Sequence, residues 1–136
     1  MGQTLIDVTN GKLIRLLVDD APFDIRYGDV HQHHRRLDLR AGLLERSVDW
    51  TSPGDTRVKV RSRRLVSFAQ RSVAAIEYVV EPVDAAARII VQSDLVANEG
   101  QPALSADPRV ASVLQSPLEP VAQDSDGHSV VLLHRT

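Results

Sequence analysis

The sequence predicts an all-β fold built as an antiparallel β-sandwich, and three observations support this. Polarity alternates with period two over most of the 136 residues, and this alternation is typical of strands with one buried face. Two pairs of segments can be aligned as hairpins in which apolar side chains and opposite charges match in a single register. The composition is 43% hydrophobic, which is enough for the core of one domain covering residues 1–136.

The N-terminal part is expected to form a hairpin. Two apolar runs, residues 5–8 and 13–18, flank the dipeptide Asn10-Gly11. Asn-Gly is the strongest signal for a two-residue turn, because both turn residues must accept positive φ. The second strand should end at Asp-Ala-Pro, residues 20–22. Residues 29–36 are polar and are predicted to form a loop.

A longer hairpin is predicted from residues 44–50 and 58–64, joined by a turn that contains Ser-Pro-Gly-Asp. An antiparallel register that pairs Trp50 with Val58 also places apolar side chains opposite each other on the inner face and opposite charges on the outer face. The further pairs in this register are Val48 with Val60, Asp49 with Lys59, and Glu45 with Arg63.

The next two strands are predicted to pair in the same way. Ile76, Tyr78 and Val80 alternate on one face, and residues 82–85 are expected to turn. Pairing Val80 with Ile89 brings Tyr78 opposite Val91 and Glu81 opposite Arg88. We therefore expect an antiparallel sheet with one solvated side.

The C-terminal part has a different character. Residues 100–102, Gly-Gln-Pro, should end the strand region, and a short helix is predicted near residues 107–115 with Asp107 as its N-cap and Pro108 in its first turn. Pro117 and Pro120 prevent a long continuation. A turn at residues 124–127 and a last strand at residues 129–133 are expected to follow.

Composition excludes several classes of function. The net charge of −2 and the pI near 6.2 argue against a nucleic-acid binder or a protein of anionic membranes. Cysteine is absent, which rules out disulfides and thiol chemistry. No apolar run approaches the roughly 18 residues of a spanning helix, and the N-terminus lacks the basic and apolar regions of a secretory signal. We therefore expect a cytoplasmic location.

Three segments in order carry a resemblance to a known family. They are the run LDLRAGLLERSVDW at residues 37–50, RSRRLVS at residues 61–67, and AAIEY at residues 74–78. Their order resembles the N-terminal β-sandwich domain of glycoside hydrolase family 65, which includes the maltose, trehalose and kojibiose phosphorylases and their hydrolase relatives. The resemblance covers nearly the whole chain but only part of the family's domain.

The resemblance implies a fold and a context for this chain. The fold would be part of a supersandwich of the galactose-mutarotase type. In the family the reaction belongs to a following α-helical barrel, so the implied partner is a catalytic domain that this chain does not contain. Such sandwich domains pack against the barrel and can help to shape the sugar site and the dimer.

Four cations, Arg57, Lys59, Arg61 and Arg63, lie on one face of a predicted strand. They could bind phosphate or nucleic acid. The alternative is a solvated face neutralised by Glu45 and Asp49. The charge pairs of the predicted register favour this second interpretation, because they explain the stripe without a ligand.

His31 and His33 would share a face if their segment were a strand, and together with Asp29 or His128 they could hold zinc. This spacing is a weak motif. A polar surface loop is the preferred interpretation, and neither a metal nor a cofactor is predicted.

Trp50 and Tyr78 are the candidate carbohydrate contacts, because an aromatic face can stack on the apolar face of a sugar ring. Their alternation with valines favours a place in the core instead. The acidic side chains of the strands, Glu45, Asp49, Glu77 and Glu81, all fall on predicted outer faces. Glycosidic-bond cleavage needs an acid in a water-excluding cleft, so no catalytic residue is predicted.

The sequence therefore predicts a non-catalytic domain of a carbohydrate-active enzyme, with structural support as its role and a sugar as a candidate ligand. We also expect homo-oligomers through exposed strand edges, above all at residues 129–133. One alternative is a stand-alone carbohydrate-binding module, which would need an exposed aromatic pair from a chain with only 4% aromatic residues. A second alternative is a mutarotase-like enzyme, which would need a histidine and a carboxylate converging in a concave sheet.

Overall fold

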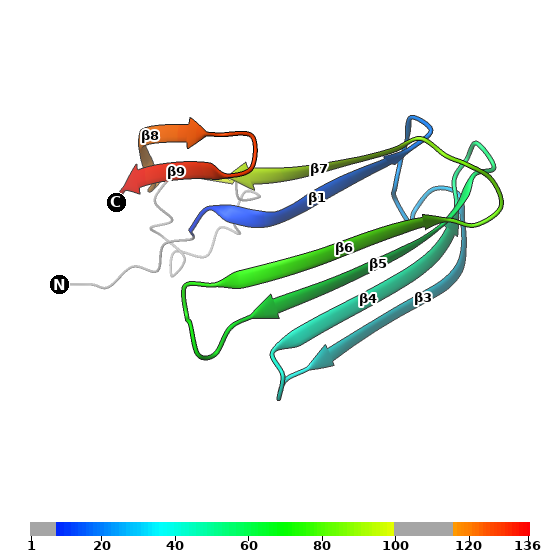
Figure 1. The fold of residues 1–136 in the computed structure, drawn as a ribbon, viewed down its shortest axis with the longest axis horizontal. Helices are drawn as coiled ribbons and strands as arrows, with labels where there is room; N and C mark the ends of the chain where they lie inside the picture. The colour runs from blue at the N-terminus through cyan, green and yellow to red at the C-terminus, as the bar shows by residue number, and fades with distance from the viewer. Residues whose placement is uncertain (1–7, 100–115) are drawn as a thin grey trace, which may run out of the picture. The chain divides into compact units, whose positions relative to one another are not determined.

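The computed structural model describes residues 8–99 and 116–136, and in these residues the fold is all-β with antiparallel strand pairing. The predicted fold class is confirmed at this level. The short helix expected near residues 107–115 lies outside the described residues. The strands (Figure 1) are β1 (Asn10–Val18), β2 (Ala21–Pro22), β3 (Asp29–Asp38), β4 (Leu43–Thr51), β5 (Arg57–Val66), β6 (Ala74–Pro82), β7 (Ile89–Val96), β8 (Glu119–Ser125) and β9 (Val130–Arg135).

The chain forms two compact units. The larger is Ile14–Ser93, and the smaller combines the beginning of β1 with the chain from Asp94 onward. The larger unit contains a four-stranded sheet in the order β3-β4-β5-β6, and β1 belongs to a second sheet in the order β2-β1-β7. The core of the larger unit is formed by Leu16, Val18, Val48, Trp50, Val58 and Val60, which come from both sheets. This is sandwich packing, with one apolar face contributed by each sheet.

The predicted register between residues 44–50 and 58–64 is confirmed. β4 pairs with β5 so that Trp50 lies opposite Val58 and Asp49 opposite Lys59. Trp50 and Val58 are completely buried, whereas Lys59 is exposed. One register thus satisfies the core on one face and the charges on the other.

The predicted pairing of β6 with β7 is wrong. β6 pairs with β5, and Val80 lies opposite Val60 rather than Ile89. β7 joins the other sheet, next to β1. The reason is that alternation identifies which side chains face inward but not which strand is the neighbour. Pairing with β5 satisfies the same apolar face and adds acidic residues of β6 beside the cations of β5.

The predicted turn at Asn10-Gly11 is also wrong. Both residues belong to β1, and neither has the positive φ that the turn would require. Gly11 is explained by a close approach instead, because an added Cβ would lie 3.0 Å from the side chain of Leu95. Residues 5–7 of the expected first strand lie outside the described residues, and Val8 is exposed and not in a strand. The predicted end of the strand before residue 20 is confirmed, since β1 ends at Val18, but Ala21 and Pro22 form the short strand β2, which pairs with β1.

Residues 29–36 form most of the edge strand β3 and not a loop, which corrects that prediction. Nearly every residue of β3 is exposed, so the strand lacks the apolar alternation by which buried strands are identified. Its backbone pairs with β4 through nine residue pairs, interrupted by an irregularity between Val30 and Gln32. Backbone hydrogen bonds, which do not depend on side-chain type, therefore define this strand.

The loops at one end of the larger unit are tied together by Asp19. Its carboxylate accepts hydrogen bonds from the backbone N–H of Arg88 at 2.7 Å and from the Thr56 hydroxyl at 2.8 Å. Its own N–H donates to the carbonyl of Arg88 at 2.9 Å. The end of β1 and the beginnings of β5 and β7 are thereby joined at this side of the sandwich.

The smaller unit contains the hairpin of β8 and β9, which pair antiparallel. The predicted last strand is confirmed, whereas the turn lies at residues 126–129 rather than 124–127, because β8 extends to Ser125. In this turn Asp126 accepts hydrogen bonds from the backbone of His128 and Ser129. The side chain of Asn98 bonds both the N–H and the C=O of Leu118, at 2.9 and 2.8 Å. Across the described residues no helix is long and apolar enough to cross a membrane.

Candidate functional site

Trp50 lies in the core of the larger unit with no exposed surface. Its indole Nε1–H donates to the carbonyl of Tyr27 at 2.7 Å, and the Phe23 ring packs edge-on against it with centroids 5.1 Å apart. This arrangement satisfies the single donor of a buried indole. Contact between Trp50 and a sugar stays a prediction, and in this structure the protein's own side chains cover the ring.

Tyr78 lies on the inner face of β6, opposite Ser62 of β5. It is half-buried, and burial raises the pKa of its phenol above the ordinary value, although the nearby charges of Arg46 and Arg64 oppose this shift. The phenol therefore remains protonated at neutral pH and can donate a hydrogen bond.

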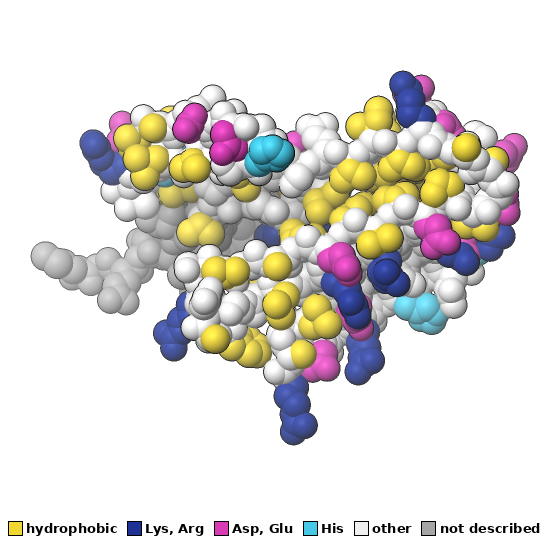
Figure 2. Space-filling model, in the orientation of Figure 1, with side chains coloured by type: hydrophobic (Ala, Val, Ile, Leu, Met, Phe, Trp, Pro, Cys, Tyr) yellow, Lys and Arg dark blue, Asp and Glu magenta, His cyan; other side chains and the backbone are white. Residues whose placement is uncertain are grey.

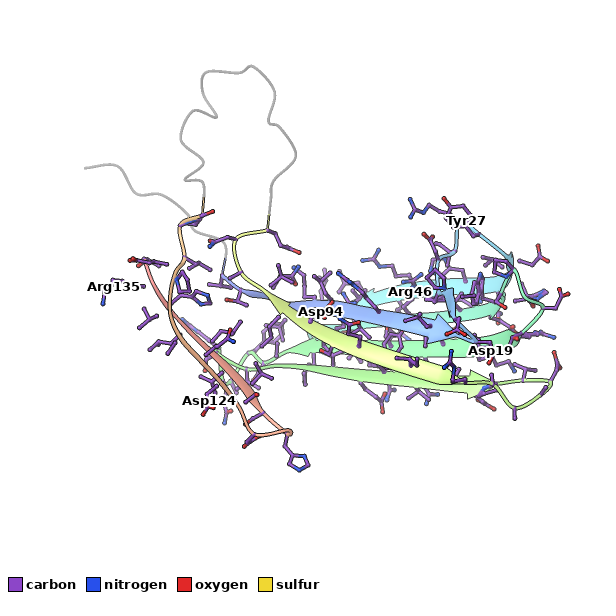
Figure 3. All side chains as sticks on the ribbon, turned by 90° about the horizontal axis from the view of Figure 1, so that it is seen from above. Asp19, Tyr27, Arg46, Asp94, Asp124 and Arg135 are labelled. Atoms are coloured by element: carbon purple, nitrogen blue, oxygen red, sulfur yellow. The ribbon has the colours of Figure 1, made fainter. Side chains whose placement is uncertain are left out.

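A pocket of about 300 Å³ opens next to Tyr78, within the larger unit. We call it the arginine pocket, and its lining residues are Ile14, Phe23, Asp24, Ile25, Arg46, Ser62, Arg64 and Tyr78. They come from β1, from the segment after β2, and from the three adjacent strands β4, β5 and β6. Figure 3 labels Arg46 among the side chains of the sandwich.

The strand periodicity explains why polar side chains face this pocket. Arg46 precedes the buried Val48 by two residues, and Ser62 follows the buried Val60 by two. Residues two apart on a strand share a face, so the inner face of the sheet continues from an apolar core into a polar region. Arg64 is two residues further along the same face of β5.

The charged side chains that line the arginine pocket are Arg46, Arg64 and Asp24. The Nε–H of Arg46 donates to Nε2 of His33 at 3.2 Å, and its guanidinium lies 5.7 Å above the Phe23 ring in a cation–π contact. Asp24 is the one acidic side chain in the lining, and it is bound by Arg26, with an Nε–Oδ2 distance of 2.9 Å. Hydrogen bonds from Arg26 lower the pKa of the Asp24 carboxyl to about 2. Arg26 therefore offsets Asp24, and within the described residues no carboxylate is paired with Arg46.

Two of the four cations on the outer face of β5, Arg57 and Arg63, are paired with carboxylates. Arg57 binds Asp49 through two hydrogen bonds, at 2.8 and 3.0 Å, and these bonds lower the pKa of Asp49. Arg63 lies 3.1 Å from Glu45 and 3.7 Å from Glu77. The expected neutralisation by Glu45 and Asp49 is confirmed, with the difference that Asp49 binds Arg57 diagonally rather than Lys59 directly opposite it.

The histidines of β3 bind separate partners. The ring Nε2 of His31 lies 2.8 Å from the Thr51 hydroxyl, and His33 accepts the hydrogen bond from Arg46. His31 falls at the irregularity between Val30 and Gln32, where a bulge interrupts the alternation that would place His31 and His33 on one face. In the described part of the chain, no three His, Asp or Glu side chains come together as a metal site.

Sequence analysis did not identify the arginine pocket. The signal was present, because Arg46 and Arg64 share parity with the core valines Val48 and Val60. Two charged residues at inward positions of a sandwich are unusual. Arg64 follows Arg63, a member of the outer stripe, directly in the sequence.

The described residues form an antiparallel β-sandwich domain with a polar inner region. Comparison with known proteins identifies its family. Residues 1–136 match the family described as "Glycosyl hydrolase family 65, N-terminal domain". The chain belongs to this family, which confirms the resemblance found in the sequence.

Several curated proteins are similar to the chain. It is 58% identical over 135 residues to an uncharacterized glycosyl hydrolase of Mycobacterium leprae, an alignment that covers 99% of this chain and 17% of the relative. It is 35% identical over 115 residues to an alpha,alpha-trehalose phosphorylase of Thermoanaerobacter brockii, covering 85% and 15%. With a kojibiose phosphorylase of Halothermothrix orenii the identity is 27% over 122 residues, covering 87% and 16%. The chain thus spans at most 17% of the length of these three relatives.

Proposed function

We propose that this chain acts as a non-catalytic domain of the supersandwich type that supports the catalytic domain of a family-65 enzyme of carbohydrate metabolism. The observation that carries the proposal is the family match over the whole chain, joined with coverage of only 17% of the first relative. A region this short can belong to an enzyme without containing its active site.

The positions of the carboxylates support a non-catalytic role. Glycosidic cleavage requires an acid held in a cleft that excludes water. On β4 the carboxylates of Glu45 and Asp49 lie on the outer face and bind arginines. On β6, Glu77 and Glu81 are exposed. None of these four side chains faces the arginine pocket.

An exposed apolar surface supports a packing role. At the end of the four-stranded sheet where β3 and β5 end, several hydrophobic side chains are open to solvent, and Figure 2 shows hydrophobic side chains gathered over this end. Leu39 and Phe68 are 78% and 67% exposed. Several exposed apolar side chains at one end of a sheet commonly mark a site of protein contact. We call it the strand-end patch, and its members are Leu37, Leu39, Leu65, Val66 and Phe68.

Two experiments test the proposal. First, the purified chain should release no glucose 1-phosphate from maltose, trehalose or kojibiose in the presence of phosphate. Release that survives removal of contaminating enzymes would overturn the non-catalytic role.

The second experiment tests support of a catalytic domain. The Mycobacterium leprae relative is produced without the region that matches this chain, and this chain is co-expressed with it. We expect the two to co-purify, and the double substitution Leu39→Lys and Phe68→Lys in the strand-end patch to weaken the association. Val83→Lys, a change at an exposed apolar side chain outside the patch, is the matched control. Failure to co-purify, with a truncated relative that is soluble and folded alone, would contradict the proposal.

A further inference from the structure

The inner face of the four-stranded sheet holds two arginines where a sandwich ordinarily places apolar side chains. Arg46 and Arg64 are both half-buried and line the same pocket. Removing a cation from water is costly unless hydrogen-bond acceptors or opposite charges compensate it. We therefore ask which hydrogen-bond acceptors surround Arg46, because N–H groups without an acceptor can bind a ligand.

Only one of the five guanidinium N–H groups of Arg46 has a hydrogen-bond acceptor in the described residues. The Nε–H is bound by His33, and the Phe23 ring supports the guanidinium. The remaining four N–H groups belong to the two terminal nitrogens. Asp24, the acidic residue of the lining, is bound by Arg26 instead. Arg46 is thus held in position by His33 and the Phe23 ring, and it is paired with no carboxylate of the described residues.

The other polar groups of the pocket suit an anion as well. Arg64 and Tyr78 line the same pocket as Arg46. Tyr78 and the buried Ser62 each carry a hydroxyl that can donate a hydrogen bond. A fork of guanidinium N–H groups with nearby hydroxyl donors is the arrangement that binds phosphate and carboxylate oxygens.

We propose that the arginine pocket binds a small oxyanion, the phosphate or carboxylate group of a small molecule, with Arg46 as the principal contact. Ser62 and Tyr78 donate hydrogen bonds that orient the oxygens. The volume of about 300 Å³ admits a group of this size with a small attached moiety. The proposal does not depend on the role of the chain as a supporting domain.

The test is titration of the whole chain with inorganic phosphate, and separately with acetate, at constant ionic strength adjusted with sodium chloride. Binding is followed by isothermal calorimetry and by the NMR signals of backbone and arginine Nε–H groups. We expect saturable binding with a millimolar dissociation constant for at least one anion, and shifts confined to the arginine pocket. Phosphate binding alone would assign a phosphate ligand, and acetate binding alone a carboxylate.

Matched substitutions decide whether the pocket is responsible. Arg46→Gln should weaken binding by about tenfold or more, and Tyr78→Phe should weaken it to a smaller extent while preserving the ring. Arg63→Gln removes the same charge from the outer face of the neighbouring strand, where Glu45 and Glu77 lie, and should leave binding unchanged. Circular dichroism confirms that each variant is folded.

Three results would overturn the proposal. The first is the absence of saturable shifts with either anion at millimolar concentrations. The second is an equal loss of affinity in Arg46→Gln and Arg63→Gln, which would mean that the anions respond only to net charge. The third is binding to an acidic protein segment without any binding of the small anions, which would reject a small-molecule site.

Discussion

Replacing Trp50 with phenylalanine should lower the free energy of unfolding by about 2–3 kcal/mol. The indole is completely buried, and its Nε1–H donates to the carbonyl of Tyr27 at 2.7 Å. Phenylalanine keeps an aromatic ring in the core, so it retains part of the packing against Phe23. The loss comes from the missing hydrogen bond and from the part of the indole that the phenyl ring does not fill.

The magnitude is the sum of three contributions. Loss of apolar burial costs about 1 kcal/mol at roughly 25 cal/mol per Å². The residual cavity adds somewhat less than about 1 kcal/mol. The hydrogen bond is worth about 1 kcal/mol, and its loss leaves the Tyr27 carbonyl without the indole donor. For a chain of 136 residues, the total corresponds to a fall of about 10 °C in melting temperature.

Urea and thermal unfolding followed by far-ultraviolet circular dichroism measure this effect, because Trp50 is the only tryptophan and fluorescence is lost with it. Phe68→Leu is the matched control, since Phe68 is 67% exposed and the change should fall within about 0.5 kcal/mol. A Trp50→Phe variant that unfolds at the same urea concentration as the unsubstituted chain would refute the reasoning. It would mean that neither the buried indole nor its hydrogen bond stabilises the sandwich.

Three further predictions follow from other parts of the chain. Gly28→Ala should destabilise the fold by more than about 2 kcal/mol, because Gly28 has φ of +77° and an added Cβ would lie 2.3 Å from the Thr51 carbonyl. Gly127→Ala, at φ of +83° with no atom within 4 Å, should show only the backbone cost of about 1 kcal/mol in the same melts. Burial raises the pKa of Tyr78 above 10.0, so its contribution to stability is complete below that pH and is lost as the pH rises through the folded value. Urea titrations in alkaline buffers should show this decline, and Tyr78→Phe should reduce it; an unchanged slope would contradict it. Finally, we expect the chain to self-associate through β9, where Val131 is 57% exposed, and Val131→Lys to oppose this; a monomer mass of 15.0 kDa at all concentrations in sedimentation equilibrium would reject the idea.

The fold was predictable where two independent constraints acted on the same residues. For β4 and β5, the core pair of Trp50 and Val58 and the charge pair of Glu45 and Arg63 fit a single register. For β6 only the inward parity was fixed, so the sequence identified the buried face but not the neighbouring strand. Prediction of strand neighbours requires information on long-range topology that local alternation does not contain.

The parts that were missed have a common physical origin. β3 is an edge strand that is exposed along nearly its whole length, so hydrophobic alternation could not identify it. Arg46 and Arg64 are polar at inward positions, and a pattern that assigns polar residues to the solvated face overlooks them. Sites that depart from the alternation of apolar inward and polar outward residues are therefore the hardest to predict from the sequence.

The hydrogen bonds of Asp19 have a consequence for the order of folding. Asp19 and Arg88 are separated by 69 residues, whereas β3, β4, β5 and β6 pair with their nearest neighbours along the chain. Closing the longer loop costs more chain entropy than forming the successive hairpins. We therefore expect the four-stranded sheet to form early and the joining of β1 to β7 to come late. Substitutions at Asp19 should then mainly accelerate unfolding, while substitutions between β4 and β5 should slow folding.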